Sequence, residues 1–99
     1  MAQQSIIGKI ATTIRNKDDL FVIRYHQTDI VTFDKHKIEL RSGGWETATT
    51  KTRMNQTSNQ FGLGYQVFQK DYKWFVDFNE QTICFSDGMI LNRRVFKWN

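Results

Sequence analysis

Residues that could catalyse a reaction or bind a metal are few in this sequence and widely spaced. His26 and His36 are the only histidines, and Cys84 is the only cysteine. Their spacing matches no zinc site, and one thiol cannot form a disulfide within the chain. His26 and Asp29 could form an acid–base pair, but the sequence offers no matching nucleophile or oxyanion-binding group. We therefore expect no enzyme, no metal and no cofactor; a catalytic cluster around His26 and Asp29 is the alternative.

The composition favours one small domain in a reducing compartment. The chain has 99 residues, of which 39% are hydrophobic and 14% aromatic, so it can bury one modest core. No apolar run is long enough to span a membrane, and the N-terminal residues lack the basic start and apolar stretch of a signal peptide. We expect a single domain over residues 1–99, in the cytoplasm and without a membrane partner. Cys84 is then expected to be a small buried hydrophobic residue in a strand.

The most informative stretch runs from residue 47 to residue 70 and contains no Asp or Glu. Its cationic and amide side chains fall into two adjacent rows on a helix, because residues four apart lie on one face. One row is Lys51, Asn55 and Asn59, and the other is Arg53, Gln56 and Gln60. Arg and Lys bind phosphates, while Asn and Gln read base edges or bridge backbone groups. Such a face suits nucleic acid, an acidic protein, or a helix that is merely solvated or structural.

A second basic cluster lies in the C-terminal segment, where three cations alternate with Phe96 and Trp98. Aromatic side chains beside cations can stack bases. The alternative is that the apolar residues close the sheet while the cations face water. The residues predicted to bind nucleic acid or a partner are therefore Lys51, Arg53, Asn55, Gln56, Asn59, Lys70, Arg93, Arg94 and Lys97.

Two further features have both a functional and a structural interpretation. The segment Ser42-Gly43-Gly44 precedes the predicted helix, whose N-terminal amides could attract a phosphate. Its glycines lack the spacing of known phosphate loops, and Glu46 would repel an anion, so we interpret it as a strand-to-helix turn. Tyr72, Trp74 and Phe78 share one face of a predicted strand and could stack bases. We expect them in the core, because a small domain needs large side chains inside.

The elements that position these residues follow from the hydrophobic pattern. Short runs with alternating apolar residues are separated by polar turn clusters, which is typical of antiparallel strands. The runs lie at 11–15, 20–27, 30–33, 38–41, 65–69, 72–78 and 82–85, with a short edge at 89–91. Between residues 46 and 60 a four-residue spacing replaces the alternation and predicts a helix. The sequence therefore predicts an α+β fold: a mainly antiparallel, curled sheet of about seven strands with one central helix, about 46–60, packed on one face.

The segment from Ser42 to Val76, together with Tyr25–Phe33, carries a distinctive string of motifs. These are Gly43-Gly44-Trp45, Thr49-Thr50-Lys51, Arg53-Met54-Asn55 and Gly62-Leu63-Gly64, within an SGGWxTxTTKxRMNQ pattern. In these residues the chain resembles a group of small proteins encoded by bacteriophages and prophages. The resemblance covers about half of the chain. It implies action in an infected bacterial cell, and it transfers no activity and no catalytic residue.

Two functions from different classes follow from these features. The first is a small phage protein that contacts nucleic acid or a nucleoprotein complex through the basic, amide-rich helix face. The second is an inhibitor or adaptor that binds a host protein or ribonucleoprotein complex, by analogy with anti-defence proteins of the anti-CRISPR type. Exposed Trp45 or Trp98 could anchor such a contact. The oligomeric state stays open, since unpaired strand edges would permit dimers.

Overall fold

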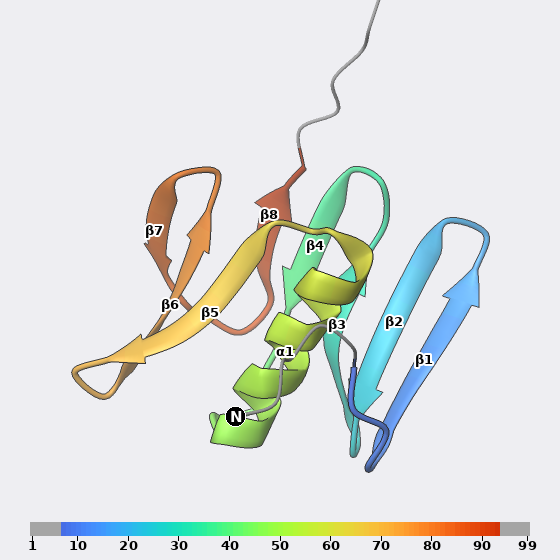
Figure 1. Ribbon diagram of the computed structural model, residues 1–99, viewed down its shortest axis with the longest axis horizontal. Coiled ribbons are helices and arrows are strands. Elements are labelled where there is room, and N and C mark those ends of the chain that lie inside the picture. Colours follow the sequence, from blue (N-terminus) through green and yellow to red (C-terminus); the bar gives the residue numbers. More distant parts are fainter. Residues whose placement is uncertain (1–6, 94–99) are drawn as a thin grey trace, which may run out of the picture.

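The computed structural model describes residues 7–93 as two antiparallel sheets and one helix (Figure 1). The first sheet has five strands in the order β1 (Thr12–Lys17), β2 (Leu20–Tyr25), β3 (Thr28–Phe33), β4 (Lys37–Leu40) and β8 (Met89–Asn92). The second sheet has three strands in the order β5 (Tyr65–Lys70), β6 (Lys73–Phe78) and β7 (Gln81–Cys84). The helix, α1 (Ala48–Phe61), lies between β4 and β5 in the chain.

The predicted α+β class, the antiparallel pairing and the single helix are confirmed, but the strands do not form one sheet. We expected about seven strands in one curled sheet, and the described residues form eight strands in two sheets. The division arises because α1 lies along β5, which pairs only with β6. The chain then returns to the first sheet through β8, which pairs with β4 (Figure 1).

Two-residue turns with left-handed backbone conformations join the strands of the second sheet. Asp71 and Tyr72, between β5 and β6, have φ angles of 54° and 65°. Asn79 and Glu80, between β6 and β7, have φ angles of 51° and 63°. Two consecutive residues with positive φ are typical of hairpin turns whose twist matches that of the flanking strands. The turns that the hydrophobic pattern predicts between the runs 65–69, 72–78 and 82–85 are confirmed.

One hydrophobic core joins both sheets and the helix. Trp74 and Phe78 lie in this core, as predicted. Tyr72, which we had grouped with them, is 94% exposed because it lies in the turn before β6 rather than in the strand. The prediction for Cys84 is also wrong: its side chain is exposed, because the neighbouring Ile83 takes the inward position on β7. The buried hydrophobic residues are Ile7, Ile23, Ile30, Val31, Phe33, Ile38, Leu40, Met54, Leu63, Tyr65, Val67, Trp74, Val76, Phe78 and Leu91.

The helix begins two residues later than predicted and ends one residue later. Thr47 is the N-cap, and its hydroxyl accepts a hydrogen bond from the backbone N–H of Thr50 at 3.2 Å. Gly62 ends the helix in a left-handed conformation, with φ at 64°, which glycine adopts without steric penalty.

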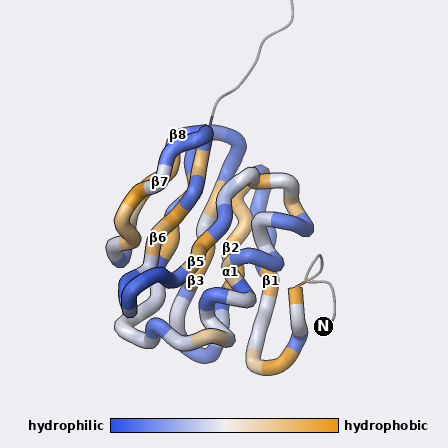
Figure 2. The backbone as a smooth tube through the Cα atoms, turned by 60° about the vertical axis from the view of Figure 1, so that its left-hand side comes forward, coloured by the Kyte–Doolittle hydropathy of each residue, from blue (hydrophilic) through white to orange (hydrophobic). Residues whose placement is uncertain are grey.

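The helix is packed against both sheets although its sequence is polar. Figure 2 shows α1 in hydrophilic colours along most of its length. Its buried residues are Met54 and four polar ones, namely Thr50, Gln56, Thr57 and Ser58. Among residues 7–93, every buried side-chain nitrogen and oxygen has a hydrogen-bond partner. Among the four buried polar residues, Gln56 bonds to Gly8 and Ser58 to Tyr65, so hydrogen bonds attach α1 to its surroundings alongside apolar contacts. In the same part of the chain, no helix has the length and apolar character needed to cross a membrane.

Candidate functional site

Two side chains of α1 take the place of a neighbouring strand along one edge of β5. The hydroxyl of Ser58 donates to the carbonyl of Tyr65 at 2.7 Å and accepts from its N–H at 3.0 Å. The amide of Asn55 donates to the carbonyl of Val67 at 2.8 Å and accepts from its N–H at 2.7 Å. Backbone groups that face one edge recur at every second residue of a strand, so these bonds continue the ladder. Asn55, predicted to bind nucleic acid, has the structural role of closing this edge.

The second amide row of α1 holds the start of the described chain. The side-chain oxygen of Gln56 accepts from the N–H of Gly8, and that of Gln60 accepts from the N–H of Ile7, both at 2.9 Å. Gln56 is only 5% exposed. The amides that suggested base recognition therefore dock an N-terminal segment onto the helix.

Arg53 belongs to the same internal network. Its Nε donates to the hydroxyl of Thr12 at 3.1 Å, and one terminal nitrogen donates to Gln56 at 3.4 Å. Its guanidinium also lies 5.7 Å from the ring centroid of Tyr25, a cation–π distance. The positive charge of Arg53 is thus used to join α1 to β1 and β2.

The remaining predicted residues are distributed over different parts of the molecule. Lys51 is half-buried on α1, and Asn59 is exposed one turn beyond Asn55. Lys70 is exposed at the end of β5, and Arg93 donates to the carbonyl of Asp34 at 2.7 Å. Arg94, Lys97 and Trp98 lie outside the described residues. Among residues 7–93, the predicted set is thus divided between α1, the end of β5 and the segment after β8.

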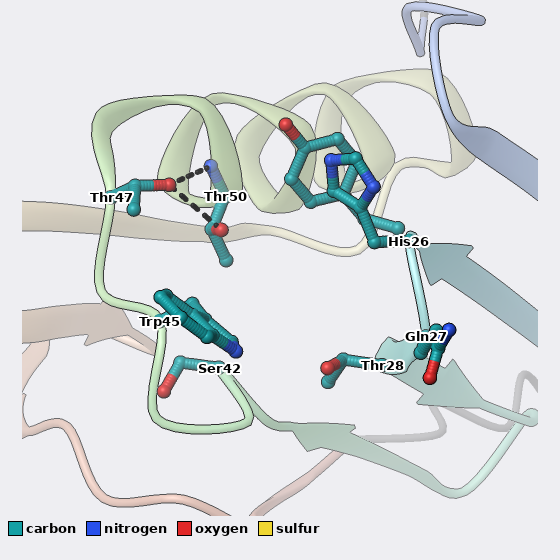
Figure 3. Close-up of a pocket in the computed structure, with 8 residues that line it drawn as sticks. His26, Gln27, Thr28, Ser42, Trp45, Thr47 and Thr50 are labelled. Atoms are coloured by element: carbon teal, nitrogen blue, oxygen red, sulfur yellow. Dashed lines mark hydrogen bonds between the residues drawn. The ribbon is translucent and has the colours of Figure 1, made fainter.

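A cleft of about 760 Å³ opens beside the N-terminus of α1 (Figure 3). Its walls come from the β2–β3 turn, the loop after β4 and the first turn of the helix. In Figure 3 the indole of Trp45 extends over the open centre, with His26 and Thr28 on the other side. Trp45 is 70% exposed. We call this the Trp45 cleft; it is lined by Tyr25, His26, Gln27, Thr28, Ser42, Trp45, Thr47 and Thr50.

A carboxylate holds the loop that carries Trp45. Asp87 accepts from the N–H of Ser42 at 3.0 Å, from its hydroxyl at 2.7 Å and from the N–H of Gly43 at 2.9 Å. Partial burial raises the pKa of Asp87, but the hydrogen bonds from Ser42, Gly43 and Gly44 outweigh it and leave the pKa below its ordinary value. The loop is therefore tied to the segment before β8.

Acidification should release this tie. Because the pKa of Asp87 is lower in the folded chain than in the unfolded chain, the unfolded chain binds protons first as the pH falls. The stabilisation by Asp87 is complete above the unfolded pKa of about 4 and is lost as the pH falls through the folded value. Urea unfolding from neutral to acidic pH should show this loss, and Asp87→Asn should reduce it. An equal loss in both proteins would contradict the assignment.

A second carboxylate also contributes to the acid sensitivity, so Asp87→Asn should remove only part of it. The pKa of Asp34 is also lowered, because the backbone N–H groups of His36 and Lys37 donate to its carboxylate at 2.8 and 3.0 Å. Acid sensitivity that remains in Asp87→Asn is expected to come partly from this turn.

His26 and Asp29, the acid–base pair considered from the sequence, each contact other residues. The carboxylate of Asp29 accepts from Nε of Arg24 at 2.8 Å and lies 3.8 Å from Arg15. The ring of His26 packs on Tyr25, with centroids 4.4 Å apart. Within residues 7–93, no group of three or more His, Cys, Asp or Glu residues could hold a metal ion.

The outer face of the second sheet carries aromatic and cationic side chains in adjacent cross-strand pairs. Phe68 on β5 and Phe75 on β6 are direct partners, and their rings stack with centroids 5.8 Å apart and planes at 27°. The next pair on the same face is Lys70 and Lys73, which flank the hairpin turn. Both phenylalanines are half-buried, and both lysines are exposed. We call this surface, formed by Phe68, Lys70, Lys73 and Phe75, the outer aromatic face.

A family model described as Kyanoviridae Gp96 protein matches residues 2–92. The chain belongs to this bacteriophage family. The resemblance of the sequence to phage-encoded proteins is therefore confirmed. No curated protein and no solved structure matches the chain, so the chemistry of this Gp96 family member follows from its own residues.

Sequence reasoning missed the outer aromatic face of the Gp96 protein, although the signal was present. Phe68 and Phe75 were placed in strands, but their pairing across a hairpin was not considered. The symmetric positions of Lys70 and Lys73 around a two-residue turn fix that pairing, because the residues before and after such a turn oppose each other.

Proposed function

We propose that this phage protein binds single-stranded nucleic acid through the outer aromatic face, without catalysing a reaction, in the cytoplasm of the infected cell. The observation that carries the proposal is the placement of Lys70 opposite Lys73, directly beside the stacked rings of Phe68 and Phe75.

The lysine pair favours an anionic ligand. Like charges directly opposite each other destabilise an antiparallel pair of strands. Among the described residues, no salt bridge neutralises the ammonium group of Lys70 or Lys73. A phosphate bound between Lys70 and Lys73 would be attracted by both charges and would offset their mutual repulsion. The lysine pair should therefore stabilise the complex and destabilise the free protein.

The phenylalanines favour an unpaired strand over a duplex. Bases of a single strand stack on aromatic side chains, which contributes about 1–3 kcal/mol per base. In a duplex the bases stack on each other and their faces are inaccessible to a flat sheet. Phe68 and Phe75 lie one residue pair away from the lysines, so base stacking and phosphate contact can occur on one segment of strand.

Tyr72 extends this surface at the tip of the hairpin. It lies between the two lysines, it is 94% exposed, and its φ of 65° is unfavourable for a residue with a Cβ, by about 1–2 kcal/mol. Its ring buries nothing in the free protein, so the fold gains no packing from this conformation. An aromatic ring presented in this way can stack on a further base.

Two acidic residues lie near this surface. Asp77 is on the same face, two residues beyond Phe75, and accepts a hydrogen bond from Thr82 at 2.6 Å. Asp71 is exposed in the turn between Lys70 and Lys73, where the two lysine charges outnumber its single charge. A phosphate backbone should therefore follow the lysine pair and avoid the end with Asp77.

Fluorescence anisotropy of labelled single-stranded and duplex oligonucleotides tests the proposal. The wild-type protein should bind DNA or RNA single strands more tightly than duplex, with an affinity that falls log-linearly with salt. Lys70→Glu/Lys73→Glu should weaken binding about tenfold or more and lower the salt slope by roughly 1, since each phosphate contact on a single strand contributes about 0.7. Phe68→Leu/Phe75→Leu should weaken binding and leave the slope unchanged.

A matched control keeps the same change in net charge. Lys17 and Lys37 are exposed residues of the first sheet, and Lys17→Glu/Lys37→Glu should change the affinity by no more than about threefold. Equal losses in both charge-reversal variants would contradict the assigned face. No binding to any strand at low salt would contradict the function and favour the alternative, an inhibitor or adaptor for a host protein.

A further inference from the structure

The Trp45 cleft displays an exposed indole on a loop that is itself firmly held. The N–H of Trp45 donates to the carbonyl of Ser42 at 3.1 Å, and its own carbonyl accepts from the N–H of Thr47 at 3.0 Å. Ser42 is buried and bound to Asp87 through both its N–H and its hydroxyl. The exposure of Trp45 is thus a property of an ordered turn, whose backbone presents the indole beside the cleft.

The opposite wall of the cleft is also fixed. The N–H of His26 donates to the carbonyl of Ala11 at 2.8 Å, and the imidazole packs on the ring of Tyr25. Arg53 lies over the Tyr25 ring at 5.7 Å. Trp45 on one side and His26 on the other therefore flank the opening (Figure 3). Tyr25, which packs on His26, also lines it.

The chemistry of the lining suits an uncharged, planar ring. Hydroxyl groups, one carboxamide and the imidazole of His26 supply the polar part, and no Asp, Glu, Lys or Arg lines the cleft. Its volume of about 760 Å³ lies within the range of small-molecule sites. A phosphate would find no Lys or Arg there, whereas a heterocycle could stack on Trp45 and form hydrogen bonds through its edge.

We propose that the Trp45 cleft binds one unpaired nucleobase, stacked on the indole of Trp45. The choice of a base rests on the proposed function, because a single strand supplies bases that are free to leave the stack. Gln27 and Thr28 offer the donor and acceptor groups that proteins use to contact base edges. The cleft is distinct from the outer aromatic face, since the two share no residue.

Titration with free nucleosides tests the cleft separately from strand binding. Adenosine, guanosine, cytidine and uridine should be added to nitrogen-15-labelled protein while the indole N–H signals are followed by NMR. The Trp45 signal is identified by its absence from the spectrum of Trp45→Phe. We expect at least one nucleoside to shift this signal with a millimolar dissociation constant, as suits a single stacked base, and ribose to leave it unchanged.

Variants of Trp45 show whether the nucleoside shifts come from binding in the cleft or from an unspecific effect on the protein. In Trp45→Ala the shifts of the remaining cleft signals should disappear, while the rest of the spectrum stays that of a folded protein because the side chain is 70% exposed. Trp45→Phe should retain part of the binding. Lys70→Glu/Lys73→Glu should keep the nucleoside shifts even though it loses affinity for strands, so failure of one proposal is distinguishable from failure of the other. Absence of any shift, equal shifts with ribose, or shifts that persist in Trp45→Ala would each overturn the inference.

Discussion

Replacing Asn55 with alanine is expected to lower the free energy of unfolding by about 2–4 kcal/mol. The substitution removes both hydrogen bonds along the β5 edge and leaves the N–H and the carbonyl of Val67 without their partner. A partly buried backbone group that loses its partner costs about 1–3 kcal/mol, and two are affected here. Urea unfolding followed by circular dichroism measures the change.

The control for Asn55 is another amide of the same region. Gln69 is exposed on β5, and Gln69→Ala should change stability by less than about 0.5 kcal/mol. Amide hydrogen exchange adds a local readout, because protection of the Val67 N–H should fall in Asn55→Ala well before protection in the first sheet. If the two variants are equally stable, Asn55 does not close the edge in the way described.

Gly43→Ala is expected to destabilise the fold by a similar amount, about 2–4 kcal/mol. Gly43 has a φ of 67°, so any Cβ is unfavourable there. A Cβ at this position would also lie 2.9 Å from Cγ2 of Thr28 and closer still to its Oγ1. The conformational and the steric penalties therefore add at this position.

The neighbouring glycine separates the two penalties. Gly44 has a φ of 85°, but a Cβ there would meet no atom within 4 Å. Gly44→Ala should therefore show only the conformational part, about 1–2 kcal/mol. Thr28→Ala should recover part of the loss in Gly43→Ala and none of the loss in Gly44→Ala. A double-mutant cycle without coupling between Thr28 and Gly43 would contradict the close approach.

Local pattern was sufficient to predict most strands, because alternation directly records which side chains face inward. The pairing of strands was not accessible in the same way. Ile38 on β4 opposes Leu91 on β8, and nothing between them in the sequence specifies that contact. The same limitation hid the division into two sheets, since alternation is equally compatible with either arrangement.

The helix shows why the candidate site was only partly predictable. Polar residues on a helix usually face solvent or a ligand, yet Gln56, Thr57 and Ser58 are buried. Ser58 bonds to the backbone of β5 and Gln56 to that of the N-terminal segment, and the positions of both partners depend on the tertiary fold. The hydroxyl of Thr57 donates to the carbonyl of Arg53 within the helix. A weak signal existed, because a helix with few apolar residues cannot be held by apolar contacts alone. With these amides bonded inside the fold, the exposed cations and aromatic side chains of the β5–β6 hairpin are the better candidates for contacting a ligand.

The way in which α1 is attached also affects how the domain responds to heat. Exposed apolar surface raises the heat capacity of unfolding, whereas exposed polar surface lowers it. Detaching α1 from β5 would break the bonds of Asn55 and Ser58 and would also expose the buried side chains of Met54 and Val67. Polar groups would therefore make up a larger share of the surface exposed at this junction than in the apolar core. We expect a local opening at the α1–β5 junction to carry a smaller heat-capacity change than an opening of equal area within the core.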